Sequence, residues 1–485
     1  MTEASAPDRP SASAEPLVLP PAPAPPPRKF DRSIIEGPLL PAVWKLAWPT
    51  MLSNIIGGMQ GLVDHIMVGN YVGFAANAAV GVSWQIFLVV VIFVASIFSG
   101  MSVLVARFAG AGESDKVDRT VYQAMITALV LCTAVFGPAG YFLAPTLLDL
   151  VNASPDVQRE ALPYLRIMFV FSGLMMMFFM MSDSLRSSGD AQTPLRLGVV
   201  LTTLNIVLNV ILISGVGPVP AFGTAGAAIG TVIAYGIVAI YTFVQFRRGA
   251  WVVGFPRGHS FKPDWQIIRA LFRFGLPTGF QGIAMNIGGI LMLAYIGSLA
   301  LSAPAQAAYA VSYSQLFSLV TWTSIGLMGA AAAVAGQNLG ARQPDRADAA
   351  VHVAARIALS TAAIVGAIFF LFPRQLLGIF GMTEPVVVGI GTELLRVLSV
   401  SGLFISVALT YTGGLQGTGD TRSPLFISIA SQIIVPLGIC FIIERTSTLD
   451  PIDIWLAILA GHATRCALSV LRFNQGRWRS IEVGL

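Results

Sequence analysis

Long apolar runs alternate with short polar connections along most of the chain. A helix needs about 20 apolar residues to cross the hydrocarbon core of a bilayer, and twelve runs reach that length. The first six expected spans cover residues 42–69, 78–108, 119–147, 161–187, 193–214 and 224–247. The second six cover residues 267–297, 306–337, 349–373, 388–416, 423–444 and 452–473. The pattern predicts an all-α polytopic membrane protein with 12 transmembrane helices.

Composition supports the membrane class. Apolar residues make up 55% of the 485 residues and charged residues only 11%, far less charge than a soluble chain of this size needs to cover its surface. The 48 glycines suit close helix packing in lipid, where small residues let backbones approach each other.

Lysine and arginine are concentrated in alternate connections, which predicts the orientation of the chain. The connections on one side, with the two terminal segments, hold Arg28, Lys29, Arg32, Lys116, Arg119, Arg186, Arg247, Arg248, Arg257, Lys262, Arg342, Arg346, Arg422, Arg472, Arg477 and Arg479. The other side offers only Arg159, Arg374 and Arg445. We therefore expect both termini in the cytoplasm. The net charge of +5 is spread along membrane borders, which argues against a nucleic-acid partner.

The second half of the chain repeats the first. A G-D-x-x-[TS]-P-L motif occurs at Gly189 and again at Gly419, 230 positions later. Further pairs of glycine, proline, aspartate and arginine share that offset: Gly110/Gly340, Asp115/Asp345, Asp118/Asp348, Pro155/Pro385 and Arg166/Arg396. Each copy holds an even number of spans, so both enter the membrane from the same side. We expect two six-helix lobes related by a pseudo-two-fold axis along the membrane normal.

The repeat sets the expected domain boundaries. The amino-terminal segment is rich in proline and alanine and has no apolar core, so we expect a disordered cytoplasmic tail rather than a signal peptide. The five expected regions are the tail (1–36), the amino-terminal lobe (37–250), a cytoplasmic linker (251–265), the carboxyl-terminal lobe (266–475) and a second cytoplasmic tail (476–485).

Motifs of soluble enzymes are missing from the sequence. We find no phosphate-binding loop, zinc-ligand spacing or nucleophile elbow, and the three cysteines have no metal or disulfide spacing. We therefore expect no enzyme activity, no cofactor and no metal site. If the protein pumps a molecule across the membrane, the lack of a nucleotide site means that the energy would come from an ion gradient.

Asp64 is the strongest candidate for a functional residue. It lies about two-thirds of the way through the first expected span, where an ionisable group is costly and tends to be functional. Its repeat partner is Met292, so the second lobe lacks the acid. Burial favours the neutral carboxyl and a nearby cation favours the ionised one. One aspartate can therefore serve as a site where a proton is exchanged for a substrate cation. The alternative is a structural aspartate that is hydrogen-bonded to helix ends or faces a water-filled vestibule.

Polar residues on the fifth and sixth spans are candidate partners for Asp64. Asn205 and Asn209 lie four positions apart and hence on one helix face, and buried amides need partners. Thr231 is a further candidate of this kind. Hydrogen bonding between helices is an equally open interpretation. His65 points about 100° away from Asp64 around the helix, so we expect it at a helix interface rather than in a proton relay.

A second set of residues is compatible with the wall of a substrate cavity. They are polar or adaptable positions on otherwise apolar helices: Gln60, Gln281, Asn286, Met292, Tyr309 and Tyr313. Their pattern alone is unspecific.

The chain resembles the multidrug and toxic compound extrusion (MATE) transporters over about residues 35–475. The resemblance rests on W-P-T at 48–50, V-D-H-I-M-V-G at 63–69, the loops G-A-G-E-S-D-K and G-A-R-Q-P-D-R, the paired G-D turns and N-I-V-L-N at 205–209. It implies two lobes in a V-shaped arrangement and export of cationic amphipathic compounds, driven by inward flow of protons or sodium ions.

The resemblance also implies a coupling site in the amino-terminal lobe. In one branch of the family a first-span aspartate matches Asp64, an N-x-x-x-D segment matches Asn205 and Asn209, and a sixth-span threonine matches Thr231. This chain departs from the pattern because position 209 is asparagine. With a single carboxylate, we expect the proton as coupling ion in preference to sodium. The other family pattern, with acids in the seventh and tenth spans, is absent.

The function expected from the sequence is therefore an antiporter of the bacterial inner membrane that exports cationic or amphipathic small molecules. Its partners would be these substrates and membrane lipids, and we expect a monomer. The alternative is a flippase of the same superfamily for lipid-linked oligosaccharides, which should hold cationic residues in its cavity to bind a diphosphate. An enzyme would need at least two converging catalytic groups, and Asp64 has no such mate in the sequence.

Overall fold

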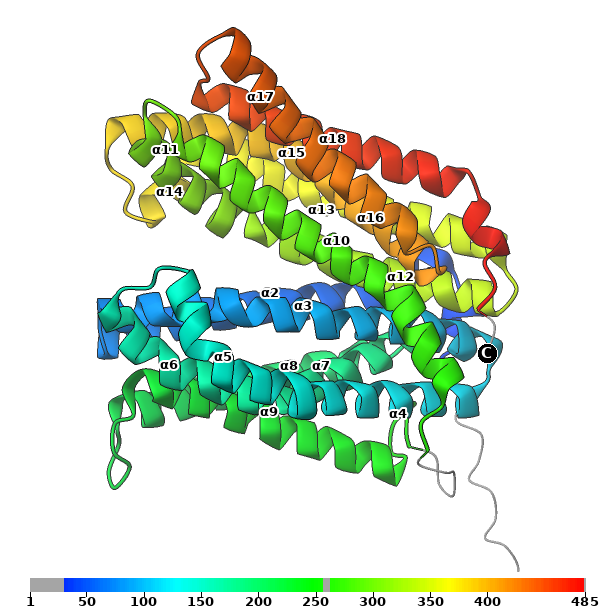
Figure 1. Ribbon diagram of the computed structural model, residues 1–485. Coiled ribbons are helices and arrows are strands. Elements are labelled where there is room, and N and C mark those ends of the chain that lie inside the picture. Colours follow the sequence, from blue (N-terminus) through cyan, green and yellow to red (C-terminus); the bar gives the residue numbers. More distant parts are fainter. Residues whose placement is uncertain (1–29, 256–261, 484–485) are drawn as a thin grey trace, which may run out of the picture.

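Two helical bundles lie side by side in the computed structural model, which describes residues 30–255 and 262–483. Most of the expected amino-terminal tail and the middle of the expected linker lie outside the described residues. Figure 1 shows the lobes in contact at one end and diverging towards the other. The end where the lobes meet is hereafter called the closed end.

Six helical runs form the amino-terminal lobe. Each long apolar sequence is helical because the hydrocarbon core offers no water to bind the backbone, so the backbone groups must bond within the segment. The runs are α2 (Leu39–Tyr71), α3 (Phe74–Ala111), a continuous run of α4 (Ser114–Val130), η1 (Leu131–Phe136) and α5 (Gly137–Leu150), the pair α6 (Pro155–Val170) and α7 (Ser172–Ser187), α8 (Gln192–Ser214) and α9 (Gly223–Arg248).

The carboxyl-terminal lobe repeats this plan. Its runs are α10 (Trp265–Gly297), α11 (Ser302–Tyr309) with η2 (Ala310–Leu316) and α12 (Ser318–Gly340), α13 (Pro344–Leu371), α15 (Pro385–Gly417), α16 (Arg422–Ile429) with η3 (Ala430–Ile434) and α17 (Val435–Thr446), and α18 (Pro451–Asn474). Three short elements were not expected from the sequence: α1 (Ser33–Glu36), α14 (Pro373–Ile379) and η4 (Arg477–Ser480).

Twelve runs are long enough to cross a membrane. Ten of them, among the described residues, are also apolar enough by themselves, and the bent pair α6 and α7 forms an eleventh. The remaining one, α2, has 33 residues, the same length as α10. Its hydropathy is lowered by Lys45 at one end and by Gln60, Asp64 and His65 in its second half.

The fourth span is broken, although its sequence predicts one helix over 161–187. The axes of α6 and α7 differ by 53°, and Phe171 between them leaves helical geometry with φ −101° and ψ 11°. The adjacent Ser172 and Gly173 form a serine–glycine pair, which is one recognised cause of sharp helix bends. After the bend, α7 packs mainly against α3, α4 and α9 of its own lobe.

Glycines bring the two lobes into backbone contact at the closed end. A Cβ atom added to Gly110 of α3 would come within 1.9 Å of the Gln337 carbonyl oxygen, and one added to Gly340 of α12 within 2.1 Å of the Arg107 carbonyl oxygen. Gly110 and Gly340 are repeat partners, and so are Arg107 and Gln337. The contact is therefore reciprocal, as a pseudo-two-fold axis between the lobes requires.

Polar side chains reinforce this contact by reaching the paired G-D turns. Arg107 donates hydrogen bonds from Nη2 to the carbonyl oxygens of Thr418, at 3.2 Å, and Ile481, at 2.6 Å. Its repeat partner Gln337 donates from Nε2 to the carbonyl oxygen of Ser187, at 2.8 Å. Each lobe thus holds the turn of the other lobe.

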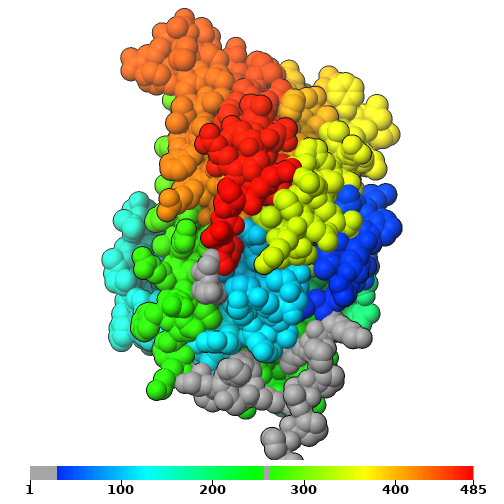
Figure 2. Space-filling view, turned by 90° about the vertical axis from the view of Figure 1, so that its right-hand side faces the viewer, coloured from blue at the N-terminus to red at the C-terminus, as the bar shows by residue number. Residues whose placement is uncertain are grey.

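The terminal segments complete the closed end, and neither is a free tail where it is described. Ile34 of α1 is fully buried, and Asn338 of α12 donates a hydrogen bond to its carbonyl oxygen at 3.3 Å. Trp478 of η4 is fully buried and stacks on Phe473 with ring centroids 4.9 Å apart. Figure 2 shows the carboxyl-terminal segment, in red, running down to the junction between the lobes.

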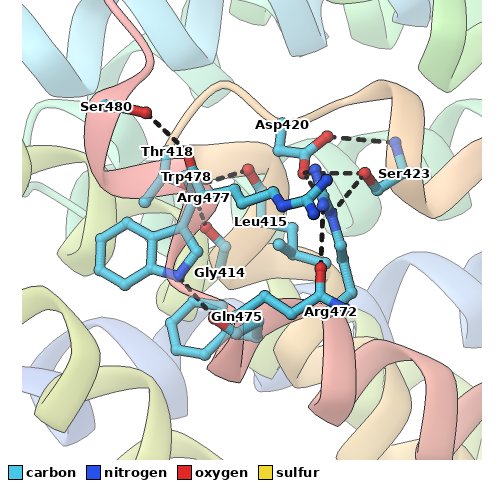
Figure 3. Close-up of polar contacts among 11 residues, drawn as sticks. Gly414, Leu415, Thr418, Asp420, Ser423, Arg472, Gln475, Arg477, Trp478 and Ser480 are labelled. Atoms are coloured by element: carbon cyan, nitrogen blue, oxygen red, sulfur yellow. Dashed lines mark hydrogen bonds and ion pairs between the residues drawn. The ribbon is translucent and has the colours of Figure 1, made fainter.

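An ion pair fixes the second G-D turn next to that segment (Figure 3). Asp420 accepts hydrogen bonds at its Oδ2 atom from Nε and Nη2 of Arg472, at 3.0 and 2.8 Å, and from the Ser423 hydroxyl at 2.8 Å. The Asp420 side chain is only 7% exposed, so the pair is shielded from solvent. Arg472, which the sequence analysis counted with the carboxyl-terminal segment, lies in the last turn of α18.

We predict that Gly110→Ala weakens the contact between the lobes. The added methyl group has to push aside the Gln337 carbonyl, because backbone atoms cannot rotate away as a side chain can. Overpacking of this kind costs about 1–3 kcal/mol of stability. Thermal unfolding of the purified protein in detergent should show a lower Tm. Gly198→Ala is the matched control, since a Cβ at Gly198 of α8 meets nothing within 4 Å; equal Tm values for the two variants would contradict the prediction.

Candidate functional site

A cavity of about 580 Å³ lies between the lobes. Both lobes contribute to its wall, which combines small polar groups with aromatic rings. The lining includes Asn54, Gln60, Trp84, Asp183, Arg186, Thr202 and Tyr235 from the amino-terminal lobe and Thr278, Trp322 and Gln416 from the other. A volume in this range fits a drug-sized organic molecule.

A chain of hydrogen bonds links four residues that the sequence singled out in three different spans. Asn209 of α8 donates from Nδ2 to Oδ1 of Asp64 in α2, at 2.8 Å, and to Oδ1 of Asn205, at 3.4 Å. Asn205 in turn donates from Nδ2 to the Thr231 hydroxyl of α9, at 3.1 Å. Both asparagines are fully buried and Asp64 is half-buried. The structure thus brings the four predicted residues together, whereas their role in coupling stays a proposal.

Helix geometry explains how the network is assembled. Asn205 and Asn209 are one turn apart on the face of α8 that packs against α2 and α9. Gly230 of α9 provides the room for Asn209, because a Cβ atom there would lie 2.3 Å from the Asn209 Oδ1 atom. That amide oxygen is buried and has no hydrogen-bond partner. The site therefore holds one unused acceptor beside the carboxylate.

The network lies behind the cavity wall. Gln60, one turn before Asp64 on α2, lines the cavity and accepts a hydrogen bond from the Thr202 hydroxyl at 3.2 Å. Tyr235 of α9 also lines the cavity and is close enough to Asp64 to interact with its charge. A charge change at Asp64 can therefore act on a molecule in the cavity through one layer of side chains.

Five of the six residues proposed for a substrate wall lie elsewhere in this conformation; Gln60 alone of the set lines the cavity described above. Gln281 is buried against Ser428 and Gln416, and the latter lines the cavity. Asn286 donates a hydrogen bond to a carbonyl of its own helix. Met292, Tyr309 and Tyr313 belong to the core of the carboxyl-terminal lobe, where the two tyrosine rings stack 4.8 Å apart.

Sequence reasoning missed one charged pair in the cavity. Arg186 was expected in a connection, but Asp183 and Arg186 both line the cavity near the end of α7. Arg186 donates from Nη1 to the Asp183 Oδ1 atom at 3.0 Å. Their i, i+3 spacing was the available signal for an ion pair. The pair leaves this part of the wall without a net charge.

His65 has an interface role, as expected. Its Nδ1 atom is 2.6 Å from the Asn77 Oδ1 atom of α3, so the ring joins the first two spans. It makes this contact on α3, while Asp64 bonds α8. Among the described residues no group of three or more histidine, cysteine or acidic side chains is arranged to hold a metal ion.

Comparisons with known proteins agree with this geometry. The model of the MatE family matches residues 49–211 and 277–442, one segment in each lobe. A probable multidrug resistance protein NorM of Thermotoga maritima is 27% identical over 441 residues, covering 90% of this chain and 93% of that protein. The multidrug resistance protein MdtK of Pectobacterium atrosepticum is 24% identical and covers 88% of this chain and 94% of its own.

Solved structures share the fold. A multidrug resistance MATE family transporter of the MOP superfamily, solved in an outward-facing conformation, superposes with a TM-score of 0.84 at 23% identity, covering 92% of this chain and 97% of that one. A MATE in complex with MaL6 gives the same TM-score, identity and coverage. The expected fold class of two six-helix lobes and the MATE resemblance are thereby confirmed. Because the family model covers most of both lobes, the chain belongs to the MatE family of membrane transporters.

Proposed function

We propose that the protein is a secondary active antiporter that exports cationic or amphipathic small molecules in exchange for protons or sodium ions. The observation that carries the proposal is the hydrogen-bonded chain from Asp64 through Asn209 and Asn205 to Thr231, next to a cavity between two lobes. Relatives that carry multidrug resistance names support efflux of several compounds. One chain supplies both walls of the cavity, so we propose the monomer as the transporting unit.

Asn209 suits a carboxyl that alternates between two protonation states. Its amide nitrogen now donates to the Asp64 carboxylate oxygen, which stabilises the ionised form. A half-turn of the amide would instead present the unused Oδ1 atom, which can accept a hydrogen bond from a protonated carboxyl. The same residue can therefore partner Asp64 in either state. An asparagine adds no second charge, which favours exchange of a proton over binding of a sodium ion by several oxygens.

The closed end fits the cytoplasmic side of an alternating-access cycle. It gathers basic residues at the ends of the helices, as cytoplasmic borders do: Lys116, Arg342, Arg346, Arg472 and Arg479. With this end inside the cell, the lobes diverge towards the outside (Figure 1). Opening to the cytoplasm would require the reciprocal contacts of Arg107 and Gln337 to break.

Among the residues that line the cavity, Arg186 is the cation that would favour the flippase alternative. A diphosphate needs cationic groups that are free to bind it. Arg186 is already paired with Asp183, at 3.0 Å, which offsets its charge. The antiporter is therefore the function that the site supports best.

We predict that Asp64→Asn abolishes export of a fluorescent lipophilic cation from pump-deficient bacterial cells. The amide cannot exchange a proton, whereas its size leaves the packing with Asn209 in place. Asp149→Asn, in the last turn of α5 at the end of the third span, is a matched control that should export like the wild type. Efflux is measured as loss of cell fluorescence, repeated with the proton gradient collapsed and with sodium removed. Export by Asp64→Asn at the wild-type rate would exclude a coupling role for Asp64.

We also predict that Gly230→Ala slows export by about tenfold or more, since a misplacement of about 1 Å in a reactive site can cost about 100-fold. The new methyl group would collide with the Asn209 Oδ1 atom and move the amide away from Asp64. Gly236→Ala on the same helix is the control, because a Cβ there meets only a Leu174 methyl at 3.3 Å. Equal initial efflux rates for the two variants would show that the position of Asn209 is unimportant.

A further inference from the structure

Arg465 is a positive charge in the interior of the carboxyl-terminal lobe. It lies on α18 and is only 1% exposed. A buried guanidinium is costly unless an acid or several hydrogen-bond acceptors compensate it. None of the ion pairs among the described residues includes Arg465.

The one hydrogen-bond acceptor found for this charge among the described residues is a weak one. The Arg465 Nη1 atom contacts the Met285 sulfur at 3.8 Å, and a thioether is a poor hydrogen-bond acceptor. The Arg465 Nε atom is buried and has no partner at all. One turn further along α18, the fully buried Ser469 hydroxyl also lacks a partner. Two unused donor groups therefore lie on the same face of one helix.

The other polar neighbours do not supply a negative charge. His462, one turn before Arg465, is engaged with the Ser401 hydroxyl, at 2.5 Å, and stacks on Phe317. Tyr313 lies within electrostatic range of Arg465 and stacks on Tyr309. The arrangement offers donors and aromatic surface but no anion.

Met285 of α10 lies against Arg465, and its position on the helix relates it to the cavity between the lobes. It lies on α10 seven residues after Thr278, which lines the cavity, and positions seven apart share one face of a helix. Its side chain is 36% exposed. Methionine has three rotatable bonds and adapts to different neighbours. A ligand group that binds Arg465 more strongly can therefore displace the Met285 side chain without moving the helix.

We propose that Arg465, with Ser469 beside it, is a binding site for an anionic group, such as a carboxylate or sulfonate, on an amphipathic substrate. Two unused donors behind an adaptable side chain are what such a group requires, and a charge-assisted hydrogen bond is stronger than the thioether contact that it replaces. The inference rests on the proposed transport function and narrows its substrate class. Asp64 in one lobe and Arg465 in the other suit a substrate with a cationic and an anionic group, a zwitterion.

A pair of dyes tests this site directly. Tetramethylrhodamine is a zwitterion with a free carboxylate, and its methyl ester keeps the cation but loses the anion. Fluorescence anisotropy with the purified full-length protein should show tighter binding of the zwitterion by about tenfold, the value of one charge-assisted hydrogen bond. Arg465→Gln should remove that preference. Arg396→Gln, which removes an exposed arginine of the same lobe, is the control that should keep it.

A second variant keeps the experiment decisive if Arg465→Gln fails to fold. Met285→Glu places a carboxylate where the sulfur now contacts Arg465, so it should raise the Tm and abolish the preference for the zwitterion. Equal binding of the two dyes by the wild type would overturn the proposal. An equal loss of binding of both dyes in Arg465→Gln would also overturn it, because that result would indicate a structural role for the arginine.

Asp64→Asn separates this inference from the proposed coupling mechanism. The variant should lose export yet retain the preference for the zwitterionic dye, because the carboxylate is bound in the other lobe. Loss of the preference in Asp64→Asn would contradict a separate anion site. Export by Asp64→Asn together with a dye preference that depends on Arg465 would instead overturn the coupling proposal alone.

Discussion

A polar group inside a membrane helix has no water to bond, and this constraint accounts for most of what is distinctive in the structure. Asp64, Asn209, Asn205 and Thr231 satisfy one another across three helices, with one amide oxygen left over. Asp420 and Arg472 do the same at the closed end. Arg465 departs from the rule, since its buried Nε atom has no partner. Both sites proposed for ligands are places where bonding capacity remains unused.

The second organising feature is the reciprocal contact between the lobes. Gly110 and Gly340 allow two backbones to touch, and Arg107 and Gln337 each bond the turn of the opposite lobe. The contact lies at one end only, so the lobes can diverge at the other and leave a cavity of about 580 Å³ between them. The glycine contacts consist of close backbone packing, and only a few hydrogen bonds cross between the lobes. The same surfaces can therefore separate and re-form during a transport cycle.

The sequence predicted the lobes and the Asp64 network because their signals are local or repeated. Long apolar runs specify spans, the offset of 230 residues specifies the second lobe, and Asn205 and Asn209 share a face by helical periodicity. The cavity wall was harder to predict. The break at Phe171 turns α7 and brings Asp183 and Arg186 into the cavity, and no span-length pattern contains that angle. Arg465 was missed because its burial depends on helix rotation within the lobe, which a nearly uniform apolar pattern does not fix.

The central claim is that one carboxyl, Asp64, exchanges a proton for a cationic substrate. Proton release measures this exchange directly, with purified protein in a weakly buffered solution and a pH-sensitive dye. At a pH where the free carboxyl is protonated and the cation-bound carboxyl is ionised, binding of a lipophilic cation should release about one proton per molecule bound, and Asp64→Asn should release none. Binding to the wild type without proton release, or equal release by Asp64→Asn, would contradict the account.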